Sequence, residues 1–170
     1  ILYLAHEAPQ RCLSVIDVTT PERPVLVNQL PSPTPGVTRC NSLGLSGNVR
    51  ATNIVESGTV YYDNTRIKTQ GWGAMSTDDT KKIRMYVTNS TIDAVDSGYG
   101  AYSIGDSHDH FSNTTFNVAD VGLIIGAEGS GTFTDGTVVN SGRFGVMMHT
   151  GVGGGVLTIE KGSVFNTQST

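Results

Sequence analysis

A short unit recurs from about residue 56 to the end of the chain, and this repeat restricts the fold more than any other feature. A first marker, a polar residue followed three positions later by an apolar one, begins at Asn64, Asn89, Asn113, Asp135 and Lys161. A second marker, glycine followed by apolar residues, begins at Gly73, Gly100, Gly122 and Gly145. Units of this length cannot bury an apolar face alone, so each must stack on its neighbours.

Two columns of apolar residues recur in register within these units. One column is Tyr62, Val87, Phe111, Phe133 and Ile159, and the other is Ile67, Ile92, Phe116, Val138 and Val164. We expect both columns to point inward, with tight corners of Gly, Ser and Thr between short strands. The pattern predicts an all-β parallel β-helix solenoid of about five coils over residues 56–170. A leucine-rich repeat is the nearest alternative, but its Leu-x-x-Leu-x-Leu pattern is absent.

Residues 1–55 lack the repeat and form a separate N-terminal β-strand segment in this interpretation. All six prolines lie in it, at Pro9, Pro21, Pro24, Pro31, Pro33 and Pro35. Strands are predicted at 13–18 and 25–27, and a third at 42–49 is weakened by two glycines. Such a Pro-rich strand and loop segment suits a cap over the end of a solenoid.

Composition and charge exclude several classes of protein. The chain has 15 acidic and 11 basic residues, a net charge of -4, which argues against nucleic acid as the partner. No apolar run approaches the roughly 20 residues that span a bilayer. With neither a signal peptide nor an initiator Met, the chain is expected to be a processed product or a fragment. Cys12 and Cys40 form one disulfide or remain two free thiols.

The repeated segments resemble a known class of solenoid. The stretches 58–60, 86–92 and 131–138 are similar to the coils of right-handed parallel β-helix proteins. Within that class they resemble the pectin-lyase-like superfamily, especially the Gly-Thr-Val-rich coils of autotransporter passenger proteins. Residues 1–52, through the segments 2–5, 13–18 and 24–27, resemble one LVIVD-type β-propeller repeat. This resemblance implies a remnant of a larger protein, whereas the proline content favours a cap, and both interpretations stay open.

The resemblance implies carbohydrate chemistry and directs attention to the polar cluster Asp106, His108, Asp109 and His110. Superfamily enzymes use carboxylates to bind calcium, to flank a glycosidic bond or to assist proton abstraction. Asp109 replaces residues that are mostly apolar in the other coils, so these four residues are the candidate acid/base set. A solvated corner is the alternative. No metal site or cofactor is predicted, because no fourth ligand can be placed and nothing in the sequence supports calcium.

Aromatic residues provide candidate sugar contacts. His110 aligns with Tyr61 and Tyr86, which predicts an outward, partly aromatic stripe. The candidate substrate-binding residues are Tyr61, Tyr86, Tyr99, Tyr102 and Arg143. Arg143 also aligns with Asp120 one coil away, so these two side chains are expected to form an ion pair.

Two functions follow from these observations. The first is an extracellular or cell-surface β-helix module for adhesion, carbohydrate contact or assembly, without evident catalysis. The second is a polysaccharide-active lyase, hydrolase or epimerase that uses the Asp106–His110 cluster. Self-association through the open ends of the solenoid is a further expectation.

Overall fold

The structure is a computed structural model of the 170-residue chain. It describes residues 2–5, 13–17, 25–30, 37–41, 44–47, 51–70, 73–77, 80–94, 98–149, 154–160 and 162–168. Within these ranges the regular structure is all strand, and no helix has the length and apolar character needed to cross a membrane. The chain divides into two compact units, Ile1–Arg39 and Cys40–Thr170.

The first unit contains an antiparallel sheet in the order β1-β2-β3. Its strands are β1 (Leu2–Ala5), β2 (Leu13–Asp17) and β3 (Val25–Leu30). The predicted strand at 13–18 corresponds to β2, with residue 18 outside the described residues, and the predicted strand at 25–27 is confirmed as part of the longer β3. The six prolines and Cys12 lie outside the described residues, whereas Cys40 is part of β4.

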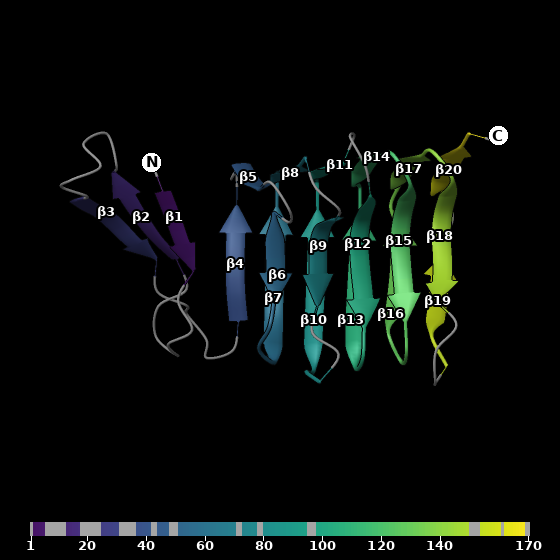
Figure 1. The fold of residues 1–170 in the computed structure, drawn as a ribbon, viewed down its shortest axis with the longest axis horizontal. Coiled ribbons are helices and arrows are strands. Elements are labelled where there is room, and N and C mark those ends of the chain that lie inside the picture. The colour runs from purple at the N-terminus through teal and green to yellow at the C-terminus, as the bar shows by residue number, and fades with distance from the viewer. Residues whose placement is uncertain are drawn as a thin grey trace. The chain divides into compact units, whose positions relative to one another are not determined.

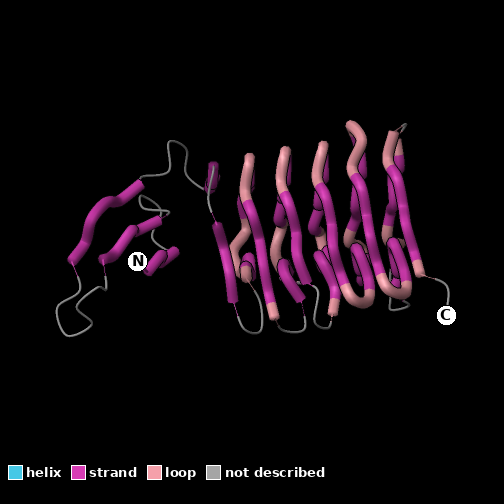
Figure 2. The backbone as a smooth tube through the Cα atoms, turned by 90° about the horizontal axis from the view of Figure 1, so that it is seen from above, coloured by secondary structure: helices cyan, strands magenta, loops and turns pink. Residues whose placement is uncertain are grey.

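The second unit, together with the start of β4 at residues 37–39, is a parallel β-solenoid with three sheets, in which each strand pairs with its counterpart in the next coil (Figures 1 and 2). Sheet I consists of β4 (Val37–Asn41), β7 (Gly58–Asp63), β10 (Ile83–Thr88), β13 (Ser107–Ser112), β16 (Ser130–Thr134) and β19 (Val156–Ile159). Sheet II consists of β5 (Gly44–Gly47), β8 (Arg66–Thr69), β11 (Thr91–Ala94), β14 (Thr115–Val118), β17 (Val138–Ser141) and β20 (Val164–Thr167). Sheet III consists of β6 (Thr52–Ile54), β9 (Gly73–Thr77), β12 (Tyr99–Ile104), β15 (Val121–Gly126) and β18 (Phe144–His149).

This arrangement confirms the predicted all-β parallel solenoid. The sheets also include strands before residue 56, where the repeat first becomes visible in the sequence. Strands β5 and β6 pair in register with β8 and β9, although neither carries the marker residues. The predicted strand at 42–49 corresponds to β5.

Aromatic side chains fill the interior between sheets I and II. Phe111 and Phe133 stack with ring centroids 5.3 Å apart, and Phe116 meets Phe111 edge to face at 4.9 Å. All three are fully buried. The first predicted column is confirmed by the register of sheet I, although Ile159 in the last described strand of that sheet is 51% exposed.

The second predicted column is wrong by one residue in its last two coils. Ile92 pairs with Phe116, but Phe116 pairs with Val139, and Val139 pairs with Phe165. Val138 and Val164 therefore belong to the neighbouring column. The turn before β17 is longer by one residue, because Asp135 and Gly136 both adopt left-handed conformations, with φ of 51° and 75°.

The first sequence marker has a conformational origin at the corner between sheets I and II. Asn64, Asn89, Asn113 and Asp135 all have φ between 46° and 51°. Asn and Asp tolerate this left-handed region better than other residues with a side chain. The residues that follow Asn64 and Asn89 connect the two coils at this corner, because the Ser90 hydroxyl accepts a hydrogen bond from the Thr65 amide at 3.0 Å. The repeat is therefore a series of equivalent turns.

Candidate functional site

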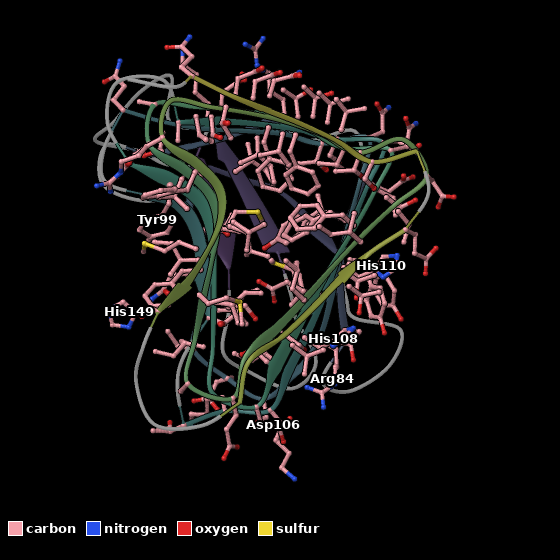
Figure 3. All side chains as sticks on the ribbon, turned by 90° about the vertical axis from the view of Figure 1, so that its right-hand side faces the viewer. Arg84, Tyr99, Asp106, His108, His110 and His149 are labelled. Carbon is pink, nitrogen blue, oxygen red and sulfur yellow. The ribbon has the colours of Figure 1, made fainter. Side chains whose placement is uncertain are left out.

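The four residues of the predicted acid/base cluster do not point to one place. Strand β13 alternates, so His108 and His110 face outward and Asp109 faces the interior. Asp106 lies in the turn before β13. Arg84, Asp106, His108 and His110 lie along one side of the solenoid, the outer face of sheet I (Figure 3). Asp109 is separated from these side chains by the sheet itself.

Asp109 is fully buried, between its register partners Met85 and Gly131. Among the residues that the structure describes, neither of its carboxyl oxygens has a hydrogen-bonding partner. Burial raises the pKa of Asp109 to about 8, and the nearby Ser103 hydroxyl opposes this shift. That hydroxyl donates to the Ser130 carbonyl oxygen at 2.9 Å. Asp109 is therefore a neutral acid inside the core at neutral pH.

A hydrogen-bond chain determines the tautomer of His108. The Nδ1 atom of His108 lies 2.6 Å from Ser130 Oγ. The Ser130 hydroxyl donates its proton to the Ser107 carbonyl oxygen at 3.0 Å, so Oγ accepts a hydrogen bond from His108 Nδ1–H. Partial burial lowers the pKa of His108, and the charges of Arg84 and His110 lower it further. His108 is thus neutral at pH 7, with a lone pair on Nε2.

The predicted aromatic stripe is present on the outer face of sheet I. Tyr61 and Tyr86 stack with centroids 5.0 Å apart and planes 13° from parallel, and Tyr86 is 5.7 Å from the His110 ring. The Tyr61 and Tyr86 rings are therefore stacked along the axis, whereas the His110 ring is tilted by 42° to Tyr86. His110 Nε2 lies 3.4 Å from Thr134 Oγ1, and that hydroxyl donates to Asp135 at 3.0 Å.

Two cations beside this stripe pair with one carboxylate. Arg84 Nη2 is 3.1 Å from Asp106 Oδ1, and Lys82 Nζ is 3.7 Å from Asp106 Oδ2. Arg84 also donates to the Asp106 carbonyl oxygen at 2.8 Å. Asp106 therefore holds these two basic side chains beside β10. These ion pairs give Asp106 a structural role.

The other candidate tyrosines lie on a different sheet. Tyr99 and Tyr102 meet edge to face at 5.8 Å on β12, in an apolar cluster with Val121, Ile124 and Met147. Tyr99 is only 2% exposed and lies on the opposite side of the solenoid from His110 (Figure 3). The four tyrosines thus form two separate groups.

The predicted pair of Arg143 and Asp120 is confirmed. Arg143 Nε is 2.6 Å from Asp120 Oδ1, and Nη2 is 2.9 Å from Oδ2, so the contact is bidentate. The guanidinium also lies 5.0 Å from the centre of the Phe144 ring. Both charged groups are partly exposed, at the corner between sheets II and III.

The outer face of sheet II carries a ladder of amides that sequence reasoning missed. Asn117 donates to Asp93 at 2.9 Å, Asn140 donates to Asn117 at 3.0 Å, and Asn166 donates to Asn140 at 2.9 Å. Asp93 anchors the ladder and also accepts two hydrogen bonds from Arg66. The spacing of these asparagines matches the repeat, which is the signal that could have revealed them.

A groove of about 550 Å³ follows this ladder. Its lining consists of Asn117, Val118, Ala119, Asn140, Ser141, Gly142, Asn166, Thr167 and Gln168. None of these side chains carries a charge. Ser141 is 4% exposed, and its hydroxyl has no hydrogen-bonding partner in the described part of the chain.

No group of three or more His, Cys, Asp or Glu side chains that could hold a metal ion occurs among the described residues. The chain matches no family model, no curated protein and no solved structure.

Proposed function

We propose that this solenoid binds a linear, neutral glycan along the amide ladder of sheet II, outside the cell or at its surface, and does not cleave it. The observation that carries this proposal is the ladder of Asn117, Asn140 and Asn166 along one side of a groove. A polysaccharide chain that lies parallel to the axis of the solenoid would contact an equivalent amide in each coil. The resemblance of the coils to pectin-lyase-like solenoids also favours a carbohydrate ligand.

The amides retain hydrogen-bonding capacity after the ladder has formed. A carboxamide has two N–H groups and an oxygen with two lone pairs. Asn140 uses one N–H toward Asn117 and one lone pair toward Asn166. One donor and one acceptor therefore remain, and sugar hydroxyl groups complement both. The groove volume falls within the range of roughly 300–1,000 Å³ that is usual for ligand sites.

The lining favours binding over catalysis. Glycoside cleavage needs an acid and a base or nucleophile beside the scissile bond. Among the described residues, the groove lining includes no Asp, Glu, His, Lys or Arg. The predicted acid/base candidates His108 and His110 lie on sheet I, and Asp109 is inside the core. Uncharged amides also suit a neutral polymer better than a uronate.

The test is a panel of neutral, uronate and sulfated polysaccharides, followed for binding and for new chain ends. Two variants address the groove. Ala119→Trp fills it without removing a ladder hydrogen bond, and Asn140→Ala removes the central amide. We expect capture of a neutral polysaccharide by the native protein and at least tenfold weaker capture by both variants.

The matched control is Tyr61→Ala combined with Tyr86→Ala, which removes the aromatic stripe on the other sheet. Capture should be unchanged in this double variant. If the tyrosine double variant lost capture and Ala119→Trp retained it, the ligand would bind on sheet I, and the groove would not be the binding site. New chain ends formed by the native protein would establish the enzyme alternative instead.

A further inference from the structure

We propose that His108 and His110 together bind one divalent transition-metal ion, such as Ni²⁺ or Zn²⁺, on the outer face of sheet I. The site is independent of the glycan groove. Both imidazoles belong to β13 and are separated by one residue, so both project from the same face of the strand. Both side chains are half-buried, so each retains access to solvent.

Each imidazole has one nitrogen that contacts a hydroxyl of the next coil, and the other nitrogen has no hydrogen-bonding partner within the described ranges. His108 Nδ1 donates to Ser130 Oγ at 2.6 Å, because that hydroxyl is committed to the Ser107 carbonyl. His108 Nε2 therefore carries the lone pair. Histidines that bind metals usually donate their second N–H to an acceptor in this way, which orients the ring and fixes the tautomer.

His110 has the corresponding arrangement. Its Nε2 lies 3.4 Å from Thr134 Oγ1, whose proton goes to the Asp135 carboxylate at 3.0 Å. The Thr134 oxygen can therefore only accept from His110 Nε2–H, so Nδ1 is the His110 nitrogen that would bind the metal. The metal would have His108 Nε2 and His110 Nδ1 as protein ligands, and water or an added ligand would complete its coordination. Neutral imidazole is a preferred ligand for zinc, copper and nickel.

The surrounding charges permit a cation at this position. Arg84 is in register with His108, and Asp106 pairs with Arg84 at 3.1 Å. Asp135, beyond Thr134, contributes a negative charge on the other side and lies close enough to His110 for the two to interact electrostatically.

The experiment is calorimetric titration of the full chain with Ni²⁺, and separately with Zn²⁺, at pH 7.4. We expect one ion per chain, and at least tenfold weaker binding in His108→Ala and in His110→Ala. Ser130→Ala should weaken binding about tenfold while leaving both ligands in place, as outer-shell substitutions do. Circular dichroism of each variant checks that the solenoid is intact.

The two remaining histidines provide controls. His149 lies on sheet III, away from the pair (Figure 3), and His6 lies outside the described residues. His149→Ala and His6→Ala should bind as the native protein does. The proposal is overturned if the native protein shows no saturable binding, if only one of His108 and His110 matters, or if either control abolishes binding.

Discussion

Asp109 and Met85 are register partners in neighbouring coils, and both side chains point into the same apolar interior. The core thus holds a carboxyl group at a position that is Met85 in one coil and Val60 in the coil before it. A protonated carboxyl is tolerated there because it carries no charge. An ionised one would leave an uncompensated charge in a medium of low polarity.

The stability of the protein should consequently fall as the pH rises. The folded protein retains the Asp109 proton up to a pKa of about 8, whereas the unfolded chain releases it near 3.8. Between these pH values the folded state binds one proton more, so Asp109 lowers the free energy of unfolding by about 1.4 kcal/mol per pH unit. This contribution should be flat below pH 4 and above pH 8. Denaturant unfolding at a series of pH values measures it.

Substitution isolates this contribution from other titrating groups. Asp109→Asn removes the titration, so the difference in unfolding free energy between native protein and variant should grow with pH from 5 to 8. Asp109→Val, which copies Val60, should in addition be more stable than the native protein at pH 8 by at least about 1 kcal/mol. Parallel pH profiles for native protein and variants would contradict the buried, neutral carboxyl.

The solenoid could be predicted from the sequence because its periodicity is local. Inward residues such as Phe111 and Phe133 recur with the coil, and one coil length places them in register. The error at Val138 arose at a turn that accepts either one or two left-handed residues. A pattern of apolar residues does not reveal that difference when Val138 and Val139 are adjacent and equally apolar. Turn conformation therefore limits register prediction in this protein.

The candidate site was less accessible from sequence for a different reason. Alternation along β13 separates Asp109 from His108 and His110, which follows from strand geometry once the strand is placed. The tautomer of His108 depends on Ser130, which lies 22 residues away and is brought close by the coil stacking. The amide ladder likewise depends on contacts between coils. Contacts between coils can be predicted only after the register of every coil is known.

The amide ladder should contribute to stability according to the number of hydrogen bonds that each member makes. Asn140 takes part in two ladder bonds, whereas Asn166 takes part in one. At about 1 kcal/mol per bond, Asn140→Ala should lower the free energy of unfolding by about twice as much as Asn166→Ala. Urea denaturation of the two variants gives the comparison. Equal effects would mean that the ladder adds no stability of its own.

Three glycines of sheet III, Gly100, Gly122 and Gly145, should be sensitive to the smallest enlargement, because side chains from sheet II occupy the space beside them. A Cβ added to Gly122 would lie 2.3 Å from the Gly145 carbonyl oxygen and 2.4 Å from a methyl group of Val139. The first contact is with backbone, which cannot rotate away. Overpacking of this kind typically costs about 1–3 kcal/mol, so Gly122→Ala should lower the melting temperature by several degrees.

Gly154→Ala is the matched control, since a Cβ at Gly154 meets nothing within 4 Å. Thermal unfolding should separate the two variants, and equal melting temperatures would show that the interior beside Gly122 is loosely packed.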